Sequence, residues 1–400
     1  MKTRAYNNAI DLLHHSLILF TILFGTYFTK QPVFGPLYLH DACLLLIVSI
    51  ASIRIASRYT FQPIIILLLI SIIYLILSLV MRSGLTTVIL RQYALFGYCL
   101  MFYILFNKTF QEGSYAIHIR FLRLCGIISL ILQCVFVFVV IIQGNNPLLD
   151  YNYFSPAIVI GLIVAASAWM AYVKDVRAKL AGFLAILALV LTTGHSSAFL
   201  AVFLAGFTFL FLKVNARSKS IIIWTGLISI FLLYLFLPQF QDANANWRMM
   251  IWGHILQNSI TQQFGLIGNG FGVPFFDEEI IKSLYHDIGA TGFFGTDKPF
   301  EAYNSTAHNF FITVVFSIGL IPALLILYPF FKSIPFHFKA DKLRATSDAE
   351  FIFMALIGST VWAAFNVVLE LPHSAGLYWL IYFTCLASME TSRQPGSIPN

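Results

Sequence analysis

The chain has 400 residues, of which 59% are hydrophobic and 10% are charged, and its mean hydropathy is +0.83. Soluble domains carry about 25% charged residues, so this composition excludes a soluble protein. The net charge of +7 does not indicate a nucleic-acid partner, because the basic residues lie in short segments between apolar runs. The composition predicts an all-α polytopic membrane protein, with residues 1–400 forming a single integral-membrane domain.

Apolar runs long enough to cross the roughly 30 Å hydrocarbon core of a bilayer recur along the whole chain. The first follows Lys2 and Arg4 but precedes no small-residue cleavage site, so it is interpreted as an uncleaved helix. Apart from Arg91, the spans are expected to hold no charged groups inside the membrane. Twelve spans are predicted, at about 10–28, 38–53, 64–81, 88–106, 121–142, 156–173, 179–194, 196–213, 220–237, 309–331, 350–370 and 375–389.

Basic residues divide unequally between the two sides that this assignment creates. With the N-terminus inside, 18 Lys and Arg residues fall in inner segments and 6 in outer ones. The short clusters at 174–179, 213–219 and 332–344 all lie on the inner side. Because inner loops carry the excess of Lys and Arg, both termini are expected to be cytoplasmic. The large loop 238–308, between spans nine and ten, is then expected on the outer side.

This outer loop is the only long polar interval of the sequence. From Asn246, a good helix N-cap, an amphipathic helix is predicted to run to about Phe264, with Arg248 and Trp252 on one face. The glycine run 268–272 is not a dinucleotide-binding fingerprint, because no strand–helix unit surrounds it. It is interpreted as a sharp loop that packs its backbone closely against a neighbour.

Two side chains at the ends of the loop carry the predicted chemistry. Arg248 stays charged and can hold a phosphate through two N–H groups; the alternative is an arginine that reaches lipid head groups. His308, followed by Asn309 where the loop re-enters the membrane, suits a general base; the alternative is an interfacial hydrogen-bonding histidine. The loop contains no dense spacing of metal ligands, so neither a metal nor a cofactor is expected.

Other candidates lie on the same outer side of the predicted topology. Arg91 falls about one turn inside the fourth span, where an isolated charge is costly unless it has a function. His195 and Ser196 occupy the tight hairpin between spans seven and eight. Arg82, at the outer boundary of the third span, is interpreted as a surface or topological charge.

The order of these features resembles the O-antigen ligase and polymerase superfamily of bacterial envelope proteins. The resemblance rests on many spans with one large outer loop late in the chain, and on three motifs. These are Arg248-x-x-x-Trp252 followed by the glycine run 268–272, the re-entry motif 308–312, and the hairpin 192–197. The family's hairpin often ends in arginine where this chain has Ser196, and ligases often carry a glutamate where it has Ser317. These departures favour a polymerase over a ligase.

The resemblance implies a glycosyltransferase C-like helical bundle that performs metal-independent glycosyl transfer on the periplasmic face of the bacterial cytoplasmic membrane. The donor would be a glycan on undecaprenyl pyrophosphate. Arg248, helped by Arg91, would hold the pyrophosphate, and His308 would take the proton from the acceptor hydroxyl. The remaining substrate-binding candidates are His195, Ser196 and Asn309.

The acceptor distinguishes the functions that remain open. A polymerase would use a second lipid-linked repeat unit, and a ligase would use lipid A–core. Membrane lipid, a flippase and a chain-length regulator are the further partners that the resemblance implies. The alternative of another class is a membrane transporter whose outer loop forms a lid, which predicts polar or broken spans near the membrane midplane.

Overall fold

The computed structural model describes an almost entirely helical chain. The described residues are 2–34, 37–53, 61–109, 114–147, 156–213, 248–257, 266–275, 307–332, 347–366 and 368–391, with a few single positions between 220 and 235. Within them the strands are a short antiparallel pair, β1 (Pro32–Phe34) and β2 (Leu37–Tyr38), which joins the first two helices.

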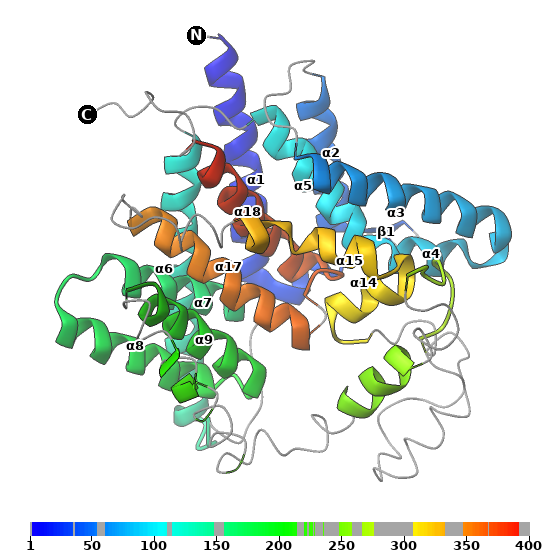
Figure 1. The fold of residues 1–400 in the computed structure, drawn as a ribbon. Helices are drawn as coiled ribbons and strands as arrows, with labels where there is room; N and C mark the ends of the chain where they lie inside the picture. The colour runs from blue at the N-terminus through cyan, green and yellow to red at the C-terminus, as the bar shows by residue number, and fades with distance from the viewer. Residues whose placement is uncertain are drawn as a thin grey trace.

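The helices account for most of the predicted apolar runs (Figure 1). They are α1 (Lys2–Thr29), α2 (Leu39–Ser52), α3 (Gln62–Met81), the 3-10 turn η1 (Ser83–Leu85), α4 (Thr86–Gln92), α5 (Ala94–Thr109), α6 (Ser114–Ile142), α7 (Pro156–Tyr172), α8 (Val176–Leu191), α9 (Ser196–Lys213), α14 (Phe310–Ile318), α15 (Leu320–Ile326), α17 (Ser347–Phe365) and α18 (Pro372–Thr391). The predicted span 220–237 lies mostly outside the described residues.

Five described segments are long and apolar enough to cross a membrane. They are Asn8–Thr29, Gln62–Met81, Ser114–Ile142, Ser196–Lys213 and Ser347–Phe365. A sixth is possible if the bent pair Ser83–Gln92 and Ala94–Asn107 forms one span. A helix satisfies all its backbone groups internally, which is what a chain needs in lipid. The fold is therefore consistent with the predicted all-α membrane protein.

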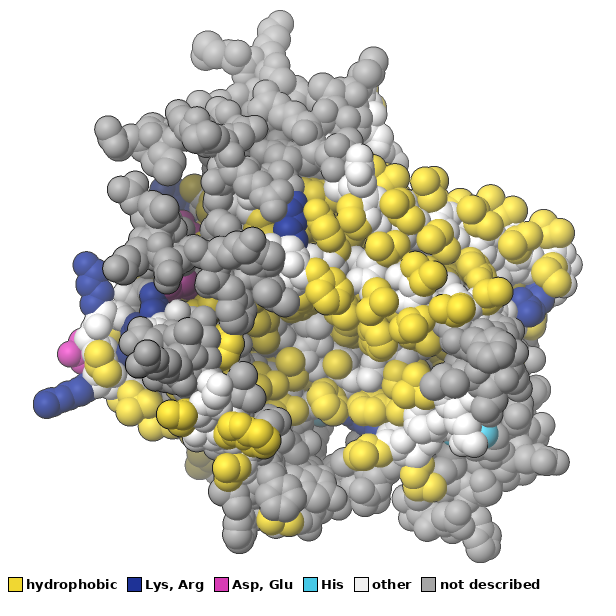
Figure 2. All heavy atoms as spheres, viewed as in Figure 1, with side chains coloured by type: hydrophobic (Ala, Val, Ile, Leu, Met, Phe, Trp, Pro, Cys, Tyr) yellow, Lys and Arg dark blue, Asp and Glu magenta, His cyan; other side chains and the backbone are white. Residues whose placement is uncertain are grey.

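The centre of the bundle is α7, which packs against α6, α8, α9, α17 and α18. Its residues from Ile158 to Val164 are buried on every side, as expected for a helix that is apolar all round. By contrast, α3 and α6 present apolar side chains outward; Val80 is 76% exposed and Phe138 is 63% exposed. Figure 2 shows apolar side chains gathered over the flank where α3 projects. Such large apolar faces are suited to contact with lipid.

Helices α9 and α17 run antiparallel, because the end of each helix is bonded to the start of the other, and this separates two polar ends of the bundle. Lys213, at the end of α9, forms an ion pair with Glu350 in the first turn of α17. Beside it, the Tyr172 hydroxyl donates to Asp348, and the Arg123 guanidinium lies over the Tyr172 ring at 4.4 Å. The opposite end is formed by the first residues of α9 and the last residues of α17.

Two predicted continuous spans are broken helices, so those predictions were wrong in detail. The run expected at 309–331 divides into α14 and α15 at Gly319, whose φ of 96° is a conformation that favours glycine. The run expected at 88–106 starts as α4 and bends by 58° into α5. The sequence hides both breaks, because apolar residues continue through them.

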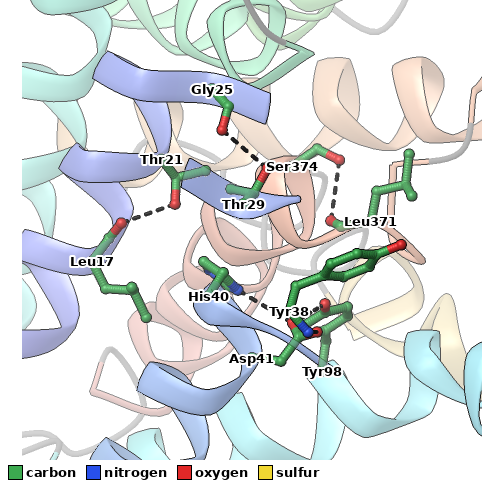
Figure 3. Close-up of polar contacts among 10 residues, drawn as sticks. All are labelled: Leu17, Thr21, Gly25, Thr29, Tyr38, His40, Asp41, Tyr98, Leu371 and Ser374. Atoms are coloured by element: carbon green, nitrogen blue, oxygen red, sulfur yellow. Dashed lines mark hydrogen bonds and ion pairs between the residues drawn. The ribbon is translucent and has the colours of Figure 1, made fainter. Parts of the chain in front are cut away.

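Ionisable side chains other than Arg91 are buried in the described part of the bundle. Six ionisable side chains on α1, α2 and α6 are no more than 7% exposed: Asp11, His14, His15, His40, Asp41 and His118. Contacts between helices compensate for their burial. Asp41 accepts hydrogen bonds from the Tyr98 hydroxyl at 2.5 Å and the Tyr38 backbone N–H at 3.0 Å (Figure 3).

Candidate functional site

Arg248 lies at the end of α17. The described part of the predicted amphipathic segment, residues 248–257, is helical; Asn246 and Phe264 lie outside the described residues. The Arg248 Nη1 donates a hydrogen bond of 2.6 Å to the carbonyl of Phe365, the last residue of α17. A cation is favourable there, because the final carbonyls of a helix carry partial negative charge.

The same helix is attached to the segment that carries His308. Trp252 Nε1 donates to the Ala307 carbonyl at 2.6 Å, and the Trp252 ring packs on Phe365 at 5.5 Å between centroids. One face of the helix is covered by a small apolar core. Its buried members are Ile251, Ile255, Phe275, Ala307, Ile312 and Phe316. The helix therefore joins the end of α17 to the residue directly before His308.

His308 has an unusual backbone conformation. Its φ is 49°, and among the residues that the structure describes it is the one non-glycine with a positive φ. Left-handed backbone is uncommon for a side-chain-bearing residue and is often retained at functional positions. Asn309 follows in extended conformation and its Oδ1 accepts from the N–H groups of Phe311 and Ile312 at 3.0 and 3.1 Å. This cap starts α14 directly after His308.

His195 belongs to the same group of residues. It lies in the turn between α8 and α9, with its ring edge against Trp362 of α17 at 5.3 Å between centroids. Burial first, and then the positive charge of Arg248, lower the pKa of His195 to about 4. The same two causes, in the same order, lower the pKa of His308 to about 4. Arg248 thus acts electrostatically on both imidazoles, and both are neutral at pH 7.

Ser196 and Asn309 have local structural surroundings. Ser196 is half-buried as the first residue of α9. Its neighbour Ser197 accepts a hydrogen bond of 3.0 Å from Asn366 Nδ2, which ties the start of α9 to the end of α17. The Asn309 amide oxygen is engaged in capping α14. Their predicted contacts with substrate stay predictions.

Arg91 is not joined to this group by any contact in the described part of the chain. It is exposed near the end of α4. The neighbouring Gln92 and the more distant Arg82 instead bind the loop 238–308. Gln92 Oε1 accepts from the Gly272 N–H at 2.6 Å, and Arg82 Nη1 donates to the Phe271 carbonyl at 3.2 Å. The interpretation of Arg82 as a mere surface charge was therefore incomplete.

The glycine run packs its backbone against neighbouring helices, as predicted. The Gly268 N–H donates to the Tyr74 hydroxyl at 3.2 Å and the Phe271 N–H to Ser78 Oγ at 2.8 Å. The Phe271 ring is fully buried against Tyr93 and Phe96. We call residues 268–272 the glycine turn.

The glycine turn also fills the break between α14 and α15. The Asn269 and Gly270 N–H groups donate to the carbonyls of Phe316 and Ser317 at 2.7 and 2.9 Å. A Cβ atom on Gly268 would lie 2.3 Å from the backbone of Ser317, so no larger residue fits without a shift. Sequence reasoning missed these partners because they are distant along the chain.

Glu370 is a further ionisable residue near α14. It is half-buried in the segment before α18. Burial raises its pKa to about 7, and the neighbouring Thr313 hydroxyl of α14 acts in the opposite direction. The carboxyl therefore titrates near neutrality. Its position between the last two apolar runs was visible in the sequence, but nothing in the spacing indicated α14 as its neighbour.

Among the described residues, no group of three or more His, Cys, Asp or Glu side chains is arranged to hold a metal ion. The chain matches no known protein family, and comparison with curated proteins finds no significant match. The arrangement itself consists of one guanidinium acting on two neutral imidazoles at the end of a helical bundle. It can bind an anion and accept a proton in the same place.

Proposed function

We propose that this chain is a surface-polysaccharide polymerase of the O-antigen type. In this proposal it transfers a glycan from undecaprenyl pyrophosphate to a lipid-linked repeat unit on the periplasmic face of the bacterial cytoplasmic membrane. The observation that carries the proposal is that the helix of Arg248 is bonded to Ala307, directly before His308, and that Arg248 acts electrostatically on His308, although the two residues come from opposite ends of one long loop. A fixed cation and a neutral base are the two groups that metal-free transfer from a pyrophosphate needs.

The reaction follows from these two groups. The neutral His308 takes the proton of the acceptor hydroxyl as that oxygen attacks the anomeric carbon of the donor sugar. The bond between this carbon and the pyrophosphate oxygen breaks, and the pyrophosphate leaves with the bonding electrons. Arg248 offsets the charge that develops on the leaving group through guanidinium N–H groups other than the one bonded to Phe365. His195 and Ser196 line the same end of the bundle; Arg91 has no assigned part.

The proposed orientation has twelve spans, both termini in the cytoplasm and the loop 238–308 in the periplasm. Its support is the separation of charge along α9 and α17. Arg248 and His195 lie at one end, and Lys213, Arg123 and Tyr172 with Asp348 lie at the other. An 18-residue α9 is about 27 Å long, which is close to the thickness of the hydrocarbon core.

The test uses purified protein in detergent with a synthetic polyprenyl-pyrophosphate repeat unit as donor and acceptor. Exchange of His308 for glutamine should lower the transfer rate by about 10²–10⁴-fold, because general-base assistance is lost. His254→Gln is the matched control, since His254 is a half-buried histidine of the same helix that has no part in the proposed reaction, and it should leave the rate unchanged. Full transfer by a folded His308→Gln variant contradicts the proposal.

A second acceptor separates polymerase from ligase. The same assay with lipid A–core as the acceptor gives product only for a ligase. We expect elongation of the repeat unit and no transfer to lipid A–core. The further partners in this proposal are membrane lipid, a flippase that delivers the repeat unit and a regulator of chain length.

A further inference from the structure

Two lysines from neighbouring helices meet over one aromatic ring at the end of the bundle far from the candidate site. Helices α8 and α9 pack against each other (Figure 1). The Lys179 Nζ lies 4.2 Å from the centre of the buried Phe209 ring, and the Lys213 Nζ lies 5.4 Å from the same centre. The ring attracts both cations, but two ammonium groups held this close to one point repel each other.

A carboxylate compensates one of these two charges in the described part of the chain. Lys213 forms an ion pair with Glu350 of α17. Lys179 forms no ion pair with a described carboxylate. Asp175, one helical turn before Lys179, instead accepts a hydrogen bond of 2.7 Å from the Ala178 N–H and so caps the start of α8. The pair of lysines therefore retains a positive charge that an anion can balance.

A tryptophan indicates where the membrane surface lies relative to these lysines. Trp169 of α7 is partly exposed, and its Nε1 donates to the carbonyls of Ala178 and Lys179 at 3.2 Å each. Its ring packs on Gly182, where an added Cβ atom would lie 2.2 Å from the ring. Tryptophan is enriched at membrane–water interfaces, because its ring is apolar and its N–H is polar. Trp169 thus indicates that Lys179 lies at the level of lipid head groups.

Exposed apolar side chains continue from the lysines along the outside of the bundle. Val176, Leu180 and Leu184 are each more than half exposed, and we call these three residues the α8 stripe. Their four-residue spacing places them on one face of the helix. On α9, Leu210 follows Phe209 directly and is also exposed. Cations beside an apolar stripe are complementary to a molecule that has both a phosphate and acyl chains, whereas a soluble phosphate would contact the cations alone.

We propose that Lys179 and Lys213 bind the phosphate of an anionic phospholipid whose acyl chains lie along the α8 stripe. The phosphate reduces the repulsion between the two ammonium groups, and each ammonium group donates charge-assisted hydrogen bonds to the phosphate oxygens. This site lies at the opposite end of α9 from His195 and Arg248. It therefore does not rest on the proposed glycosyl transfer.

A diffuse attraction between basic residues and anionic lipid is the competing explanation. Each Lys or Arg near a membrane surface adds about a fivefold gain in affinity for anionic lipid wherever it lies on that surface. Arg177 is exposed two residues before Lys179, so Arg177→Gln and Lys179→Gln remove the same charge from the same turn of α8. A diffuse attraction predicts an equal effect of the two substitutions, whereas the proposed site predicts an effect of Lys179→Gln alone.

The experiment adds lipid to the full chain, purified in an uncharged detergent, and measures the bound lipid by native mass spectrometry. The probes are dioleoylphosphatidylglycerol, the zwitterionic dioleoylphosphatidylcholine and inorganic phosphate. We expect the wild-type protein to bind phosphatidylglycerol about tenfold more tightly than phosphatidylcholine, and inorganic phosphate to leave the bound lipid in place. Lys179→Gln should lower the affinity for phosphatidylglycerol about five- to tenfold. Arg177→Gln, and Lys179→Arg, which keeps the charge, should retain the wild-type affinity.

Three outcomes overturn the proposal. Equal affinities of the wild-type protein for the two phospholipids do so without any variant, and so independently of folding defects. An equal loss of affinity in Lys179→Gln and Arg177→Gln indicates a diffuse attraction in place of a site. Displacement of phosphatidylglycerol by inorganic phosphate indicates that a soluble anion is the ligand of the two lysines. Glycan transfer by the same preparations is a separate readout, so its absence leaves the lipid site unaffected.

Discussion

At the scale of single residues, His308 combines a left-handed backbone with an imidazole that stays neutral. Its φ of 49° occurs directly before the Asn309 cap, so the start of α14 constrains the position of the ring. The sequence indicated His308, Arg248 and His195 as candidates. It could not indicate that the His195 ring would lie against Trp362, because that contact depends on how α9 and α17 pack.

The pH dependence of transfer should report the pKa of His308. The pKa is lowered to about 4 by burial and by Arg248, and the base works only when neutral. The rate should therefore be constant around neutral pH and fall as the pH decreases through about 4. Arg248→Gln removes one of the two causes, so the acidic limb of the pH–rate profile, where the transfer rate falls, should move to higher pH. It should stay below pH 6.5, because burial is the larger cause of the lowered pKa.

This measurement separates the two roles of Arg248. Hydrogen bonds from Arg248 to the leaving pyrophosphate affect the maximal transfer rate. The positive charge of Arg248 near the His308 imidazole affects the pH of the acidic limb of the pH–rate profile. A limb that does not move in Arg248→Gln contradicts the electrostatic contact. Arg248→Lys is the matched control, because lysine keeps the positive charge but cannot hold the pyrophosphate through two parallel N–H groups.

Glu370 should make stability depend on pH in the opposite direction from an ordinary carboxylate. Its folded-state pKa is raised to about 7 from 4.5, so the folded protein binds this proton more tightly than the unfolded one. The stabilisation is fully present below pH 4.5 and is lost as the pH rises through 7. It amounts to about 1–3 kcal/mol.

Glu370→Gln tests this linkage through melting temperatures measured from pH 5 to pH 8. The variant cannot ionise, so it should gain stability over the wild type as the pH rises and match it near pH 5. An equal difference at every pH contradicts the assigned burial of the carboxyl. Glu350→Gln is the comparison variant in the same melting-temperature series, because Glu350, unlike Glu370, forms an ion pair with Lys213.

At the scale of elements, the sequence predicted helices well and their breaks poorly. The apolar runs that became α3, α6 and α9 are regular, and their positions agree with the prediction. The run that became α14 and α15 is just as apolar, but the break at Gly319 depends on the glycine turn, which lies far away along the chain. Local composition carries no sign of such a partner.

Gly319→Ala should disrupt the junction of α14, α15 and the glycine turn. The backbone there has a φ of 96°, and an added Cβ would lie 2.2 Å from the Leu266 carbonyl oxygen. We expect a loss of about 1–3 kcal/mol, because left-handed backbone and a backbone clash act together. A lowered melting temperature in detergent, with weaker glycan transfer, is the measurement.

Gly253→Ala is the control for this change. Gly253 lies in helix 248–257, and a Cβ there meets nothing within 4 Å. Alanine favours helix by about 1 kcal/mol over glycine, so this variant should be as stable as the wild type or slightly more stable. Equal melting temperatures for both alanine variants contradict the described packing at Gly319.

At the scale of the whole molecule, α9 and α17 carry polar groups at both of their paired ends. The distribution of Lys and Arg in the sequence predicts which of these ends faces the cytoplasm, and this orientation stays a prediction. The sequence did not predict that His14, His15, His40, His118 and His373 would be buried, since a few histidines barely lower the mean hydropathy of a long apolar segment. Their burial depends on how α1, α2, α6 and α18 pack together.

Cysteine labelling tests the orientation in intact cells. Met249 is 67% exposed on helix 248–257, and Val176 is 76% exposed at the start of α8. In a background without the five natural cysteines, Met249→Cys should react with a membrane-impermeant maleimide added outside. Val176→Cys should react only after the cytoplasmic membrane is opened. The reverse pattern places the Arg248 group in the cytoplasm and contradicts the proposed reaction on a periplasmic substrate.

Helix 248–257 binds the Phe365 carbonyl through Arg248 and the Ala307 carbonyl through Trp252, so it links the end of α17 to the segment that begins α14. Any ligand that draws the guanidinium away from Phe365 also pulls on the residue next to His308. Occupancy of the anion position and affinity for a molecule held by the imidazole must then influence each other equally in both directions. Trp252→Phe removes the hydrogen bond to Ala307. In this variant the affinity for the anion at Arg248 and the affinity for the molecule bound by the imidazole should both be measurable, and neither should depend on the other ligand.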